Sequence, residues 1–121
     1  MKLKIKPCSI VERDHKKSLR SYAHFGHKKN TICISREIYK LPLNHLIALI
    51  AHEVGHALAE GGTEEEANAA AKGYFGIPIR YIPRTPWGNR LQFIPSAFLK
   101  RVFEGLKTYV ELTSLKAFRP Q

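Results

Sequence analysis

The chain has 121 residues and carries a formal net charge of +10 at pH 7, from 20 Lys and Arg against 10 Asp and Glu. Its 44% hydrophobic and 25% charged residues are typical of a folded globular protein, which excludes disordered and collagen-like classes, and its length predicts a single domain over residues 1–121. The longest apolar run, Leu46 to Ala51, falls far short of the roughly 18 residues that span a membrane, so we expect no membrane partner.

The N-terminal third predicts a small sheet. Residues 2–6 alternate lysine with Leu3 and Ile5, which indicates a strand, and its lysines are typical of a sheet edge. Ser9 followed by Glu12 fits a capping box for a helix over residues 10–20. Residues 21–25 and 31–35 flank a polar turn and predict a β-hairpin.

Two helices are predicted next. Apolar residues recur at three- and four-residue spacing from about Pro42 or Asn44 to Glu60, where Gly61-Gly62 ends the pattern. Thr63 is a good N-cap for a second, alanine-rich helix over residues 64–74.

The C-terminal part is divided by prolines. Residues 79–82 and 91–94 can pair as a hairpin around Trp87, and an apolar stripe predicts a last helix over residues 96–115. Taken together, these elements predict an α+β fold, in which a sheet of three or four strands packs on the two central helices and the C-terminal helix is added to them.

The sequence His52-Glu53-Val54-Gly55-His56 is an H-E-x-x-H motif within the first of the central helices. Residues four apart lie on one helical face, one turn above each other, so both imidazoles can bind one Zn²⁺. Glu53 projects beside the metal, where it can take a proton from the metal-bound water.

A catalytic zinc site usually has a third protein ligand. The first turn of the following helix offers Glu64, Glu65 and Glu66. Acidic residues also favour helix N-termini for electrostatic reasons, and Glu66 stands where a capping box with Thr63 would use it. The residues alone therefore leave the choice among the three glutamates open.

These segments resemble a small gluzincin-type zincin metallopeptidase. Ile32-Cys33-Ile34-Ser35, then Leu46 through His56, then Glu66-Ala67-Asn68 are similar to the strand, metal helix and glutamate helix of that family. The similarity is closest to the minigluzincins and to the zincin domain of ImmA/IrrE-like proteins, and it covers about residues 20–76. It implies a zincin-like fold with the small mixed sheet packed on both helices, and it points to Glu66 as the third ligand.

The resemblance implies zinc-dependent hydrolysis of peptide bonds, a metalloendopeptidase activity on peptide or protein substrates. Zn²⁺ would be bound by His52, His56 and Glu66, and Glu53 would be the catalytic base that activates the zinc-bound water. The strand of residues 31–35 would pair with extended substrate. Donors that could stabilise the oxyanion are Tyr74, Arg80, Tyr81 and Arg84.

Two cysteines are too few for a disulfide framework, and no apolar stretch of a signal peptide is seen, so we expect a reducing cytoplasmic location. Cys8 is expected to be a small buried residue. Cys33 is expected to be a thiol at the cleft or the surface, because it alternates with Ile32 and Ile34.

Two further hypotheses concern regulation and function. The Pro-rich hairpin of residues 78–95, with Trp87 at its tip, could occupy the cleft and keep the enzyme latent, as in a zymogen, although it could equally cover the core elsewhere. The alternative to an enzyme is a binding or regulatory module with little peptidase activity. The basic surface would then bind nucleic acid or an acidic partner, although the spread of basic residues along the chain does not favour nucleic acid. A structural zinc protein is a weaker third hypothesis, because such sites favour four ligands, often cysteine.

Overall fold

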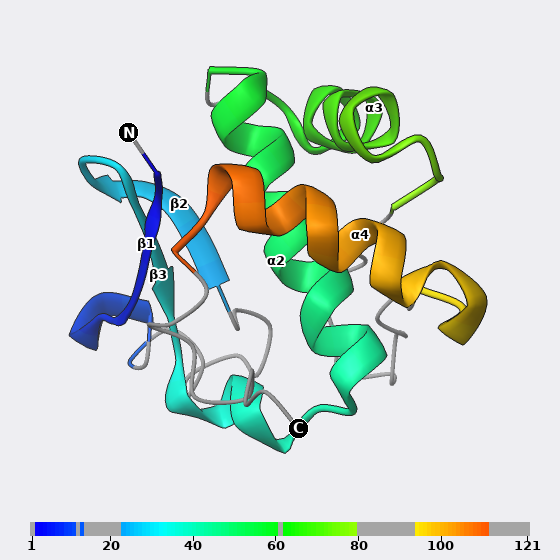
Figure 1. Ribbon diagram of the computed structural model, residues 1–121. Coiled ribbons are helices and arrows are strands. Elements are labelled where there is room, and N and C mark those ends of the chain that lie inside the picture. The colour runs from blue at the N-terminus through cyan, green and yellow to red at the C-terminus, as the bar shows by residue number, and fades with distance from the viewer. Residues whose placement is uncertain (1, 12, 14–22, 61, 80–93, 112–121) are drawn as a thin grey trace.

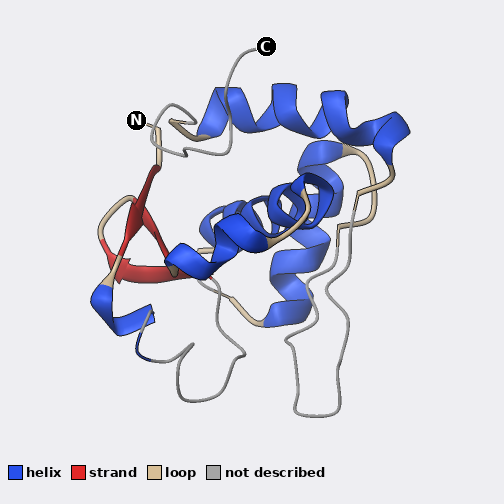
Figure 2. Ribbon diagram, turned by 90° about the horizontal axis from the view of Figure 1, so that it is seen from below, coloured by secondary structure: helices blue, strands red, loops and turns tan. Residues whose placement is uncertain are grey.

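The computed structural model describes residues 2–11, 13, 23–60, 62–79 and 94–111. Its elements are strands β1 (Lys4–Pro7), β2 (Ala23–Lys28) and β3 (Thr31–Ile34), the short 3₁₀-helix η1 (Arg36–Lys40), and helices α2 (Leu43–Leu58), α3 (Glu64–Phe75) and α4 (Ser96–Tyr109). The strands lie on one side of the molecule and the long helices on the other (Figures 1 and 2). The expected α+β, zincin-like architecture is confirmed.

The sheet is small and mixed, with strand order β1-β3-β2. β1 runs parallel to β3, and β2 runs antiparallel to it. β3 is thus the central strand and is hydrogen-bonded on both sides, so it has no open edge. The expectation that residues 31–35 pair with substrate is therefore wrong, because a strand with two neighbours has no backbone groups left for a third.

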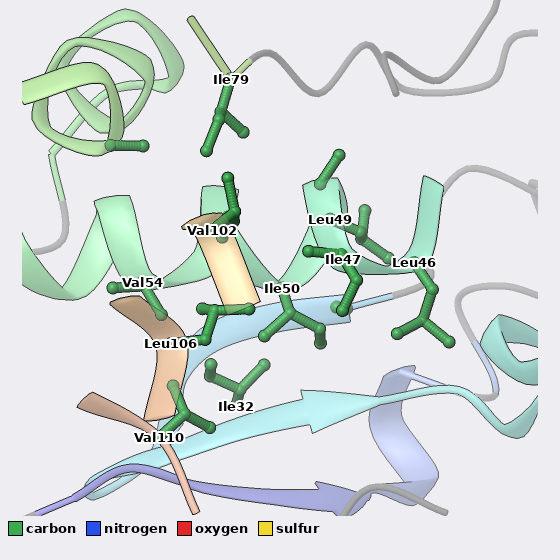
Figure 3. Close-up of a cluster of buried hydrophobic side chains, with 14 of the residues drawn as sticks. Ile32, Leu46, Ile47, Leu49, Ile50, Val54, Ile79, Val102, Leu106 and Val110 are labelled. Carbon is green, nitrogen blue, oxygen red and sulfur yellow. The ribbon is translucent and has the colours of Figure 1, made fainter. Parts of the chain in front are cut away.

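The two faces of β3 are buried by different parts of the chain. Ile32 and Ile34 face the main core, where Ile32 points toward Ile50 of α2 and Leu106 of α4 (Figure 3). Cys33 lies on the opposite face, in a small cluster with Cys8 and Val11. All four residues of β3 are therefore buried, and three of them are apolar.

Cys8 and Cys33 form a disulfide bond. The expectation of a cleft-facing or surface thiol at Cys33 is wrong, because its side chain is fully buried. Alternation along β3 does turn Cys33 away from the isoleucines, but the helical turn that follows Cys8 covers that face. Cys8 is buried, as expected.

The helices begin and end close to where the sequence predicts. α2 starts after Pro42, and α3 starts at a complete capping box between Thr63 and Glu66 and ends at Gly76, whose φ is 75°. α4 starts at Ser96 but ends at Tyr109, and the chain then forms a bridge from Val110 to Leu3 beside β1.

The predicted end of the last helix at residue 115 is wrong, because Val110 already has extended backbone. Two other predictions fall mostly on residues outside the described part of the chain, the helix over residues 10–20 and the hairpin of residues 79–82 and 91–94. Within the described residues, no helix is both long and apolar enough to cross a membrane.

Candidate metal centre

His52 and His56 lie one turn apart on α2, on the side that faces α3 and the loop before it. Their ring centroids are 4.8 Å apart. The Nδ1 atom of His52 is 2.9 Å from Oδ1 of Asn68 on α3, and Nδ1 of His56 is 3.1 Å from the carbonyl oxygen of Gly62. Each ring is thus held at its Nδ1 atom, and the Nε2 atoms of the two rings point toward a common position.

Glu64, the first residue of α3, lies where the two Nε2 atoms meet. Its Oε2 is 2.7 Å from Nε2 of His52, and its Oε1 is 3.0 Å from Nε2 of His56. One ligand atom from each of the three residues lies within 4.8 Å of the others, a grouping that could hold a metal ion. The His52 side chain is fully buried, whereas that of Glu64 is 60% exposed, so the cluster opens to solvent on the α3 side.

The hydrogen-bond partners of the rings decide what can bind between them. An amide or carbonyl oxygen only accepts, so each Nδ1 atom carries the hydrogen and donates it. In the neutral rings the Nε2 atoms are then acceptors, and they face two carboxylate oxygens that are also acceptors. A shared cation satisfies all four atoms at once, and two imidazoles with one carboxylate are a donor set that suits Zn²⁺. The residues present therefore fit a metal.

Small residues allow α2 and α3 to approach closely enough for this contact. A Cβ atom added at Gly55 would collide with the carbonyl oxygen of Ala67 and would lie 3.2 Å from Cβ of Ala71. Gly55 stands between the two histidines in sequence, so its lack of a side chain brings the first turns of α3 against them. The position of Glu64 follows from this packing.

Glu53 is also buried, with 4% of the residue exposed. Loss of hydration raises the pKa of its carboxyl group well above the usual value, and the negative charge of Glu64 raises it further. A hydrogen bond from the backbone N–H of Phe25 on β2 acts in the opposite direction. Glu53 thus lies between the cluster and the outer strand of the sheet.

Burial also lowers the pKa of His52, because it disfavours the charged imidazolium. The charge of Glu64 and the hydrogen bond to Asn68 partly offset this effect. A neutral imidazole is the form that binds a metal, so the environment of His52 favours the form that can act as a ligand.

The structure brings His52, His56 and Glu53 together but does not bring Glu66, the expected third ligand, to the histidines. The carboxylate of Glu66 turns back to accept a hydrogen bond from the N–H of Thr63, at 3.2 Å. Its own N–H donates to Oγ1 of Thr63, at 3.1 Å. Both bonds belong to the capping box that starts α3, and Glu64 takes the place beside the histidines.

A signal for Glu64 was present in the sequence. Glu64 and Asn68 are four residues apart, so they share one helical face, and that face contacts His52. The role of Asn68 as a partner of His52 was not anticipated. Neither were the hydrogen bonds from His56 to Gly62 and from Phe25 to Glu53, because they join segments that are distant in sequence or involve backbone atoms.

Of the four oxyanion donors suggested by the sequence, the structure describes Tyr74. Its hydroxyl donates to the carbonyl oxygen of Gly105 on α4, at 3.1 Å. This bond ties α3 to α4. Arg80, Tyr81 and Arg84 lie outside the described residues.

The family model of peptidase family M48 matches residues 3–73 of the chain. The match covers more than half of the chain and includes the H-E-x-x-H motif and the first turns of α3. The chain belongs to peptidase family M48. No curated protein and no solved structure matches the chain. Family M48 is a zincin-type metallopeptidase family, so the His52–His56–Glu64 cluster is the part of this M48 chain in which a metal would be expected.

Proposed function

We propose that this M48 chain is a zinc-dependent metallopeptidase whose metal ligands are His52, His56 and Glu64 and whose catalytic base is Glu53. The observation that carries the proposal is the meeting of two histidine Nε2 atoms and two carboxylate oxygens at one point, with each ring fixed from behind by an acceptor. A Zn²⁺ ion bound there would supply Lewis acidity for peptide hydrolysis, polarising the scissile carbonyl and making water a better nucleophile at neutral pH.

Glu53 performs the proton transfers. It follows the first histidine and is buried beside the ligand set, with its carboxyl pKa raised by loss of hydration. A raised pKa brings a carboxylate closer to neutral pH, where a general base and acid works best. Glu53 accepts a proton from the attacking water and delivers it to the amine that leaves.

The extended substrate pairs with β2 in this proposal. β2 is an outer strand of the described sheet, and the N–H of its Phe25 donates to Glu53, so the strand runs directly beside the base. Addition of a peptide strand to a sheet edge supplies backbone hydrogen bonds that do not depend on the substrate's side chains. This arrangement replaces the expected pairing with β3.

Latency through residues 78–95 stays a prediction, because residues 80–93 lie outside the described part of the chain. Hydrolysis by the full chain and by a Trp87→Gly variant, both folded and loaded with zinc, would test it. Equal rates would exclude occlusion of the cleft by Trp87.

The proposal as a whole is tested by metal analysis and a peptide-library assay on the purified chain. We expect one Zn²⁺ per chain and hydrolysis that a chelator abolishes. Glu53→Gln is the matched control, because it should keep the zinc and lower the rate by roughly 10²–10⁴-fold. Full activity in Glu53→Gln would contradict the mechanism, and stoichiometric zinc without hydrolysis of any library would favour the zincin-fold binding module instead.

A further inference from the structure

Four lysines lie in or beside β1, on the other side of α2 from α3 (Figure 1). Alternation along β1 buries Leu3 and Ile5 in the core and turns Lys4 and Lys6 to the opposite face of the sheet, where both are exposed. Lys2 is exposed just before the strand. Lys29 is exposed in the β2–β3 turn, which is tied to β1 by the bond from the N–H of Lys4 to the carbonyl oxygen of Asn30, at 2.9 Å. These four residues are called the β1 lysine surface below.

No ion pair among the described residues neutralises the β1 lysine surface. Lys40 and Lys107 form ion pairs with glutamates on their own helices. Within the described part of the chain, none of the four β1 lysines takes part in an ion pair. Glu111 lies beside this surface, because its N–H donates to the carbonyl oxygen of Leu3. Glu12 and Asp14 follow β1 in sequence but lie outside the described residues. Among the described residues, the surface therefore carries four lysines beside one acid, Glu111.

Half of the acidic residues lie in another part of the chain. Five of the ten fall between residues 53 and 66, in and around the metal centre. Figure 1 shows α3, which carries three of the five, on the other side of α2 from β1. In the described residues, four lysines thus lie at β1 and most of the acids lie around α3, although the sequence itself shows the basic residues spread along the chain.

We propose that the β1 lysine surface binds the phosphate backbone of nucleic acid. Its chemistry favours a purely electrostatic contact, because the large hydrophobic side chains exposed in the described residues, Leu43, Tyr74 and Phe98, belong to helices α2, α3 and α4. Insertion into a membrane needs apolar side chains, and recognition of single bases needs aromatic rings to stack on. Lysines without either bind phosphates regardless of sequence.

The test is fluorescence anisotropy of a labelled 20-base-pair DNA duplex with the full chain, across a range of salt concentrations. We expect saturable binding that weakens steeply with salt. Lys4→Gln/Lys6→Gln should weaken binding roughly tenfold at low salt and make the slope of log K against log salt less steep by about 1.8, which is two phosphate contacts at 0.9 each.

Lys72→Gln/Lys100→Gln is the matched control, because it removes the same two charges from exposed positions on α3 and α4. It should leave the slope close to that of the unmodified chain. Equal losses in both double variants would show that overall charge alone attracts DNA, and absence of saturable binding would overturn the proposal outright. Binding to vesicles of phosphatidylserine and phosphatidylcholine in preference to DNA would also overturn it. Unchanged melting temperature and zinc content in both variants show that the fold is intact.

Discussion

Gly55 of α2 lies so close to Ala67 of α3 that a Cβ atom at Gly55 would collide with the Ala67 carbonyl oxygen. The obstacle is backbone rather than the end of a flexible side chain, so it cannot move away by changing rotamer. The residue between the two histidines therefore sets the distance between the helix that carries them and the helix that carries Glu64.

Gly55→Ala should accordingly push α3 away from α2. Overpacking of this kind costs about 1–3 kcal/mol, against which the better helix propensity of alanine returns up to about 1 kcal/mol. We also expect weaker zinc binding, because Glu64 moves with α3. Urea unfolding and zinc titration measure the two effects. Gly73→Ala is the control, since a Cβ there meets nothing within 4 Å, and it should stabilise the chain. If Gly55→Ala behaved like Gly73→Ala, the close approach would not matter.

Replacing Glu64 and Glu66 one at a time distinguishes the proposed third metal ligand from the residue that caps α3. Glu64→Gln should lower zinc affinity sharply, because it removes the carboxylate that lies 2.7 and 3.0 Å from the two Nε2 atoms. Glu66→Gln should leave zinc affinity almost unchanged, because glutamine can also serve in a capping box. Zinc titration of both variants with a competing chelator shows which glutamate the metal needs. Loss of metal in Glu66→Gln alone would restore the ligand expected from sequence.

Asn68 should act as the residue that orients His52. Its Oδ1 accepts from Nδ1–H of the ring at 2.9 Å, and removal of such a partner usually costs 10- to 100-fold in metal affinity. We expect a loss of about that size in Asn68→Ala and restored affinity in Asn68→Asp, whose carboxylate also accepts from the ring. Equal zinc affinity in the unmodified chain and Asn68→Ala would show that the bond does not position the ligand.

The raised pKa of Glu53 predicts a pH-dependent effect on the metal-free protein. A carboxyl whose pKa is higher in the folded state than in the unfolded state binds its proton more tightly when folded, so it costs stability above about pH 4.5 and nothing well below it. The cost grows as the pH rises from the unfolded value toward the folded one. Glu53→Gln removes this cost, and glutamine can still accept the hydrogen bond from Phe25.

Metal-free Glu53→Gln should therefore melt at a higher temperature than the unmodified chain at pH 7–8, and the difference should disappear toward pH 4. Calorimetry of the two proteins in a chelating buffer measures it. A difference that is constant with pH would mean that the titration of Glu53 is not its cause.

The Cys8–Cys33 disulfide should stabilise the fold. It closes a loop with a sequence separation of 25 residues, for which chain entropy alone predicts about 3.5 kcal/mol. Unfolding under non-reducing conditions with and without prior reduction measures this difference. Cys8→Ser/Cys33→Ser should match the reduced protein. Two thiols titrated in unfolded, unreduced protein would contradict the bond.

The local elements could be predicted from the sequence because their signals are local. The apolar spacing before Glu60, the Thr63 cap and the alternation of Lys4, Ile5 and Lys6 each act within a few residues, and α2, α3 and β1 form close to where these patterns indicate. The H-E-x-x-H spacing likewise brings His52 and His56 onto one face of a single helix, so no long-range contact is needed to pair them.

What the tertiary structure decided depends on segments that are distant in sequence. The local capping box with Thr63 engages Glu66, whereas the packing of α3 on α2 at Gly55 brings Glu64 to the histidines. The order β1-β3-β2 closes both edges of β3, and the turn after Cys8 covers Cys33. Periodicity shows which side of an element is buried, but not which other element buries it. That choice is made by the shapes and backbone groups that meet when the whole chain packs.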